Sequence, residues 1–136
     1  MAEERIFFES QGLQLEGLLR TRPGTYGAVI AHPHPLYGGE MHNPVVGTVQ
    51  AAYAQAGYTT LRFNFRGVGT SEGTYDEGRG EQADVISALQ VLHEHGTGVV
   101  DLAGYSFGAW VIALGVDRFT SARRAVFVSP PVALIG

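Results

Sequence analysis

Strand-like runs alternate with segments of helical periodicity from residue 28 to residue 128, and this order constrains the fold more than any other feature of the chain. The strand-like runs are 28–31, 59–65, 99–103 and 125–128, and the helical segments lie at about 44–56, 81–93 and 107–114. The uniformly apolar run Ala28-Val29-Ile30-Ala31 is typical of a strand buried on both faces. The alternation therefore predicts a mainly parallel sheet with helices on both of its faces.

A β-hairpin is expected ahead of this pattern. Residues 6–9 and 13–19 are strand-like, and the turn Gln11-Gly12 joins them. No linker, repeat or low-complexity tract interrupts the chain. The predicted fold is one three-layer α/β/α domain of residues 1–136, with an N-terminal antiparallel hairpin, that is truncated after the sixth strand.

The first helix has clear start and stop signals. Asn43 is a favourable N-cap and Pro44 a favourable first helical residue, and Gly57 ends the segment. We expect its buried face to consist of the apolar residues at helical spacing, which are Val45, Val49, Ala52 and Ala56.

Composition excludes several classes of function. The 136 residues carry a net charge of −4, which argues against nucleic acid as a partner because phosphate binding needs clustered Lys and Arg. The chain has no cysteine, so disulfides and thiolate metal sites are excluded. No apolar run approaches the roughly 20 residues that span a bilayer, and the charged N-terminus does not resemble a signal peptide. A soluble, cytoplasmic protein without membrane contact is expected.

The segment Gly104-Tyr105-Ser106-Phe107-Gly108 stands where a predicted buried strand gives way to a predicted helix. A G-x-S-x-G segment in this position is typical of a nucleophile elbow, a sharp turn that exposes the serine hydroxyl above the sheet. Glycine is needed at both ends because a larger side chain would clash across the turn. Ser106 is therefore the candidate nucleophile, and the Phe107 N–H at the helix N-terminus is a candidate oxyanion donor. In the alternative interpretation, Ser106 is simply the helix N-cap.

Three segments together make the chain resemble the α/β-hydrolase superfamily, and in particular the small, cap-poor hydrolases related to dienelactone hydrolase. All three follow a predicted strand, in the family's order, and they are residues 32–39 (HPHPLYGG), 64–73 (NFRGVGTSEG) and 104–108 (GYSFG). The resemblance implies a second oxyanion donor in the loop that contains residues 32–39. Pro33 and Pro35 have no N–H, so the candidates are the amides of His34 and, second, Leu36.

The acid and the base of the expected catalytic triad are missing from this sequence. The family's chain order is Ser, then Asp or Glu, then His. After Ser106 the chain holds one carboxylate, Asp117, in a predicted solvated loop, and no histidine. We expect the acid and base to lie beyond residue 136 or on another chain, and a partner chain or a second copy to cover the open sheet edge.

The resident histidines offer weaker alternatives. His32 or His34 could replace the absent base, although both are more easily explained as supports of their loop. His32, His34 and His42 could also form a zinc set, but no water-activating carboxylate stands at a recognised spacing. No metal and no cofactor are predicted.

The sequence thus favours a serine hydrolase that acts on small carboxylic esters or related acyl compounds. The alternative is a catalytically inert hydrolase fold that serves as a binding or oligomerising module. A nucleotide-binding domain is disfavoured, because Gly67, Gly69 and Gly73 are spaced one residue too widely for a dinucleotide motif.

Overall fold

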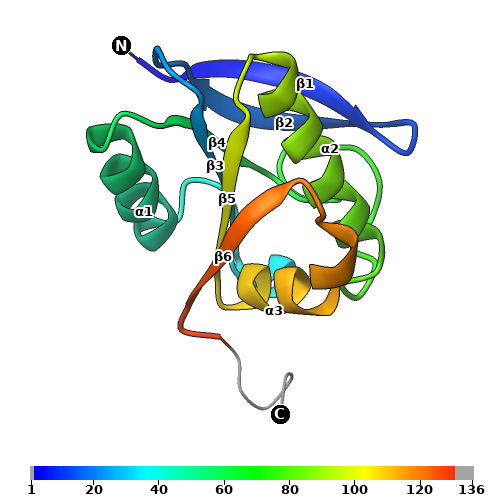
Figure 1. Ribbon diagram of the computed structural model, residues 1–136. Helices are drawn as coiled ribbons and strands as arrows, with labels where there is room; N and C mark the ends of the chain where they lie inside the picture. Colours follow the sequence, from blue (N-terminus) through cyan, green and yellow to red (C-terminus); the bar gives the residue numbers. More distant parts are fainter. Residues whose placement is uncertain (1, 131–136) are drawn as a thin grey trace.

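A six-stranded sheet in the order β1-β2-β4-β3-β5-β6 forms the centre of the protein (Figure 1). The structure, a computed structural model, describes residues 2–130, so the predicted domain limit at residue 136 lies outside the described residues. The strands are β1 (Glu4–Ser10), β2 (Leu13–Arg20), β3 (Tyr26–Ala31), β4 (Thr59–Phe63), β5 (Val99–Tyr105) and β6 (Ala122–Val128). The helices are α1 (Pro44–Gln55), α2 (Gly80–Glu94) and α3 (Phe107–Leu114), with short 3₁₀ turns η1 (Pro35–Tyr37) and η2 (Val116–Arg118).

Strand directions confirm a mainly parallel sheet with an N-terminal antiparallel hairpin. β1 pairs with β2 and β2 with β4 in antiparallel fashion, whereas β3 runs parallel to β4 and β5, and β5 runs parallel to β6. β6 begins at Ala122, three residues before the expected start. β4 ends at Phe63, two residues before the expected end, because the Phe65 amide donates to the ring of His32 instead of to a neighbouring strand.

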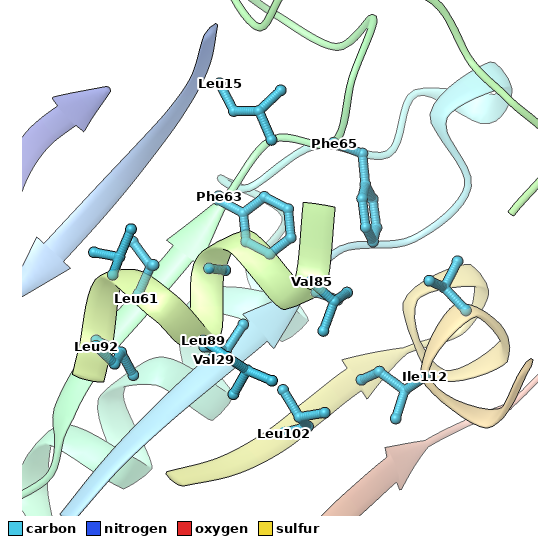
Figure 2. Close-up of a cluster of buried hydrophobic side chains, with 14 of the residues drawn as sticks. Leu15, Val29, Leu61, Phe63, Phe65, Val85, Leu89, Leu92, Leu102 and Ile112 are labelled. Atoms are coloured by element: carbon cyan, nitrogen blue, oxygen red, sulfur yellow. The ribbon is translucent and has the colours of Figure 1, made fainter. Parts of the chain in front are cut away.

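Helices cover both faces of the sheet, as predicted. Figure 1 shows α1 on one side of the sheet and α2 and α3 on the other. The backbone of β3 explains how both faces are filled, since alternate side chains point to opposite sides. Ala28 and Ile30 pack with Val46 of α1, whereas Val29 belongs to the cluster under α2 and α3. Figure 2 shows this larger cluster, which includes Leu15, Val29, Leu61, Phe63, Phe65, Val85, Leu89, Leu92, Leu102 and Ile112.

The buried face of α1 differs from the expected one. Val46, Gln50 and Ala54 are its buried residues, while Ala52 and Ala56 are exposed and Val45 and Val49 are half-buried. Apolar spacing was misleading here because a polar residue occupies the centre of the buried face. Gln50 is accommodated by a hydrogen bond from its Nε2 to Thr60 Oγ1 of β4, 3.0 Å long.

β6 is the edge strand of the described sheet. Val126 and Phe127 expose 37% and 45% of their surface, although β6 continues the parallel register set by β5. The strand is held by Asp101 of β5, a fully buried carboxylate that accepts hydrogen bonds from Arg123 and Arg124. These bonds keep the pKa of Asp101 below its ordinary value, in spite of the burial that would raise it.

Candidate active site

The turn between β5 and α3 consists of a single residue. β5 ends at Tyr105 and α3 begins at Phe107, so the expected change from strand to helix occurs at Ser106. Ser106 has φ 55° and ψ −112°, a backbone conformation that residues with a Cβ rarely adopt. Its amide donates to Val128 O at 3.0 Å, and its carbonyl accepts from the Trp110 amide at 3.1 Å. Hydrogen bonds on both sides thus hold the chain in this strained turn.

Close backbone approach explains the two glycines that flank the turn. A Cβ on Gly104 would lie 2.5 Å from the nitrogen of Ala109 in the first turn of α3. A Cβ on Gly108 would lie 2.5 Å from the carbonyl oxygen of Ala31, at the end of β3. Both distances are far below van der Waals contact, so only glycine lets α3 start directly over the ends of β5 and β3.

The hydroxyl of Ser106 does not cap α3. Ser106 occupies the N-cap position, but its side chain makes no capping hydrogen bond, which contradicts the interpretation of this residue as an ordinary N-cap serine. Within residues 2–130 the hydroxyl has no hydrogen-bond partner at all. It stands half-buried beside the first amide of α3, that of Phe107, which has no intrahelical acceptor by its position.

The loop after β3 folds around the ring of His34. The Nδ1 of His34 accepts a hydrogen bond from the Leu36 amide at 3.1 Å, and the backbone carbonyl of His34 accepts from the amides of Tyr37 and Gly39. The Leu36 amide is therefore already used inside the loop. The His34 amide, in contrast, has no acceptor within residues 2–130. Of the two donors that the sequence leaves open, the His34 amide is the one without a partner.

Aromatic contacts place this loop against the Ser106 turn. The ring of His34 lies 4.8 Å from that of Phe107, 4.7 Å from that of Tyr37 and 5.2 Å from that of Tyr75. Since Nδ1 accepts from Leu36, the neutral ring carries its proton on Nε2, which lies 3.3 Å from Tyr75 Oη. Burial lowers the pKa of His34, which favours this neutral form. Both ring nitrogens are engaged, so His34 is not free to act as a base.

The profile described as "Alpha/beta hydrolase family" matches residues 27–136. The chain belongs to the α/β-hydrolase family. An uncharacterized protein of Rickettsia prowazekii is 39% identical over 132 residues, which are 94% of this chain and 56% of that protein.

Solved structures of other hydrolases agree with the family assignment. An alpha-beta serine hydrolase homologue from Coxiella burnetii is 38% identical with a TM-score of 0.86, over 97% of this chain and 65% of the other. A serine hydrolase without a lid from Xanthomonas campestris is 30% identical with a TM-score of 0.88, over 96% and 62%. This α/β-hydrolase chain therefore spans less than two thirds of the length of these relatives.

His32 has a structural role in the α/β-hydrolase chain. The ring is fully buried, its Nε2 accepts from the Phe65 amide at 3.0 Å, and its Nδ1 donates to Pro33 O at 2.7 Å. Burial lowers the pKa of His32 from 6.5 to about 4, and the bond to Pro33 opposes this only in part. A neutral ring whose two nitrogens are both bonded cannot take a proton from Ser106.

Two buried carboxylates of α2 hold the loop that carries Tyr75, a residue that sequence reasoning missed. Glu81 accepts from the amides of Asp76 and Gly78 at 2.8 and 2.9 Å. Asp84 accepts from the Arg66 amide and guanidinium and from Ser10 Oγ. The hydrogen bonds to Asp84 thus fix the start of this loop at Arg66. Tyr75 carries no motif, and only the folded loop brings it to His34.

The remaining candidates lie apart from this arrangement. Asp117 is exposed in η2, between α3 and β6. His42 is exposed in the loop before α1, and within residues 2–130 no group of three or more His, Cys, Asp or Glu side chains is placed to hold a metal ion. No helix in that part of the chain is long and apolar enough to cross a bilayer.

Proposed function

We propose that this chain carries the nucleophile-bearing part of a serine hydrolase that acts on small carboxylic esters or related acyl compounds. The observation that carries the proposal is the Ser106 hydroxyl, which has no partner within residues 2–130 and stands on a strained turn at the start of a helix. Strain of this kind persists only where surrounding structure imposes it, and it concentrates at functional sites. The match to serine hydrolase structures supports the same reaction class.

In the proposed reaction, Ser106 Oγ attacks the acyl carbon and its proton passes to a base. The carbonyl oxygen of the substrate gains negative charge, which the Phe107 amide and the His34 amide stabilise as hydrogen-bond donors. Leu36 is not assigned this role because its amide donates to His34 Nδ1. We propose that the base and its acidic partner come from outside residues 1–136, because His32 and His34 have both ring nitrogens engaged. The dienelactone-hydrolase-like subtype and a cytoplasmic location stay predictions.

Labelling with a fluorophosphonate probe tests the nucleophile. Without a base the reaction is expected to be slow, since an oxyanion hole alone supports only weak catalysis. We expect mass spectrometry to find the label on Ser106, and Ser106→Ala to abolish it. The matched control is Ser121→Ala, which removes an exposed serine between α3 and β6 and should label as the wild type does. Equal labelling of the wild type and Ser106→Ala would refute the proposal.

The edge strand β6 favours a second candidate function, an inert fold that binds a partner or a second copy. Its exposed Val126 and Phe127 lie on a strand whose outer edge has no neighbour within the described sheet, and unpaired strand edges template association. Analytical ultracentrifugation and turnover of p-nitrophenyl acetate separate the two candidates. A monomer with Ser106-dependent turnover supports the hydrolase, and an inert oligomer supports the binding module.

A further inference from the structure

Two large apolar side chains stand exposed at consecutive positions of the loop after β3. Leu36 exposes 64% of its surface and Tyr37 exposes 86%. Single exposed apolar residues are common on protein surfaces and need no explanation. Two consecutive exposed apolar residues in a well-defined turn do need an explanation, because adjoining exposed apolar groups mark binding surfaces.

The turn that presents these side chains is rigid. Pro35 opens the 3₁₀ turn η1, and the carbonyl of His34 accepts from the Tyr37 amide at 3.1 Å and the Gly39 amide at 2.9 Å. Gly39 packs so tightly on the backbone of Pro33 that no Cβ would fit. The backbone of Tyr37 is therefore fixed before any ligand arrives, which reduces the entropy lost on binding.

Tyr37 is the outer member of an aromatic stack that begins at the Ser106 turn. Phe107 directly follows Ser106, its ring lies 4.8 Å from that of His34, and the ring of His34 lies 4.7 Å from that of Tyr37. The two inner members are buried or half-buried, whereas the outer surface of Tyr37 faces solvent. The face open for a further aromatic ring is thus at the end of this series away from Phe107, on the same loop as the His34 amide, the candidate oxyanion donor.

We propose that Tyr37, with Leu36 beside it, binds an aryl group of the substrate, so that the hydrolase prefers aryl-bearing esters to alkyl esters. The proposal rests on the proposed function, since the substrate reacts at Ser106. An aryl ring gains an offset or edge-to-face contact with Tyr37 that an alkyl chain of similar size does not make. Leu36 adds an apolar surface to the same subsite.

Two sulfonyl fluorides test this preference at Ser106. With phenylmethanesulfonyl fluoride or methanesulfonyl fluoride, an Oγ–S bond forms, the S–F bond breaks, fluoride leaves and the hydroxyl proton passes to solvent. The measured quantity is the ratio of the two labelling rates, aryl over alkyl, from intact mass spectrometry. Comparing this ratio between variants cancels the different intrinsic reactivities of the probes.

We expect Tyr37→Leu to lower the ratio about three- to tenfold, the range expected for loss of one aromatic contact. Tyr37→Phe keeps the ring and should keep the preference. The matched control is Tyr26→Ala, which removes another exposed tyrosine at the opposite end of β3 and should leave the ratio unchanged. Labelling of Ser106 with the same ratio in the wild type and Tyr37→Leu would overturn the aryl subsite and leave the proposed function standing.

A second measurement separates failure of the subsite from failure of the nucleophile. The only tryptophan, Trp110, has its ring 5.6 Å from that of Phe107, so its fluorescence reports on this region. Titration with methyl 4-nitrobenzoate, a quenching aryl ester, should give a Kd about three- to tenfold weaker in Tyr37→Leu than in the wild type. If neither sulfonyl fluoride labels Ser106 but this difference is found, the proposed function fails and the aryl subsite stands. Equal Kd values would overturn the subsite.

Discussion

The ring of His32 accepts a hydrogen bond from the Phe65 amide through Nε2, at 3.0 Å. This bond joins the loop after β3 to the loop after β4, the two loops that supply His34 and Tyr75. Nδ1 completes the arrangement by donating to Pro33 O at 2.7 Å. The loops around Ser106 are therefore fixed through a buried imidazole that must be neutral to accept the Phe65 N–H.

This requirement predicts a loss of stability in mild acid. The pKa of His32 is about 4 in the folded protein and 6.5 unperturbed, so between these values the unfolded state binds the additional proton. The contribution of His32 is fully present above pH 6.5 and decreases as pH falls toward 4. We expect the free energy of unfolding to fall by on the order of 2 kcal/mol between pH 7 and pH 5, measured by urea denaturation with Trp110 fluorescence.

Substitution isolates the contribution of this histidine. His32→Gln removes the titrating ring, so its stability should differ less between pH 7 and pH 5 than that of the wild type, whatever its absolute stability. His42→Gln changes an exposed histidine of the same loop region and should keep the wild-type difference. If His32→Gln and the wild type lose the same free energy on acidification, His32 is not the group responsible.

The buried ion pair between Arg66 and Asp84 predicts a large mutational effect far from Ser106 in sequence. Asp84 is fully buried, and its carboxylate is 2.9 Å from Arg66 Nη2 and 2.7 Å from Ser10 Oγ. Asp84→Asn removes the carboxylate that pairs with the buried Arg66 guanidinium and should destabilise the protein by about 3–5 kcal/mol in urea denaturation. Glu77→Gln breaks the exposed pair with Arg79 and should have little effect. Equal effects of the two changes would contradict this account.

Local patterns were sufficient to predict the scaffold and the Ser106 turn. The alternation of apolar runs and helical periodicity predicts the element order because burial on both faces of a parallel sheet leaves continuous apolar strands. The turn at Ser106 is predictable because Gly104 and Gly108 are demanded by close backbone contacts that any chain with this turn must make.

Features that depend on tertiary contacts could not be predicted from the sequence. Position after the strand already ranks the amide of His34 ahead of that of Leu36, but the hydrogen bond that occupies the Leu36 amide depends on where the His34 ring nitrogen points, which no spacing specifies. Tyr75 reaches His34 only because Glu81 and Asp84 hold the intervening loop. The face of α1 was misjudged for a related reason, since Gln50 is buried through a hydrogen bond to another element.

The two glycines of the turn predict a sharp contrast with a third glycine. Gly104→Ala and Gly108→Ala each place a Cβ 2.5 Å from a backbone atom, so each should destabilise the protein by about 1–3 kcal/mol or more. Gly98, between α2 and β5, has no atom within 4 Å of its virtual Cβ, and Gly98→Ala should change stability by less than about 0.5 kcal/mol. Thermal or urea denaturation of the three variants measures the contrast, and equal tolerance at all three positions would contradict the close approach of α3 to β5 and β3.

The strained backbone of Ser106 predicts that the proposed nucleophile costs stability. At φ 55° and ψ −112° a Cβ is unfavourable, whereas glycine adopts this region readily. Ser106→Gly should therefore be about 1–2 kcal/mol more stable than Ser106→Ala in urea denaturation, although both variants lack the hydroxyl and neither should be labelled. Ser87 in the interior of α2 is the matched control, because helical backbone reverses the order and makes Ser87→Ala more stable than Ser87→Gly. If Ser106→Ala is as stable as Ser106→Gly, the turn stores no strain. Backbone strain would then no longer support the assignment of Ser106 as the nucleophile.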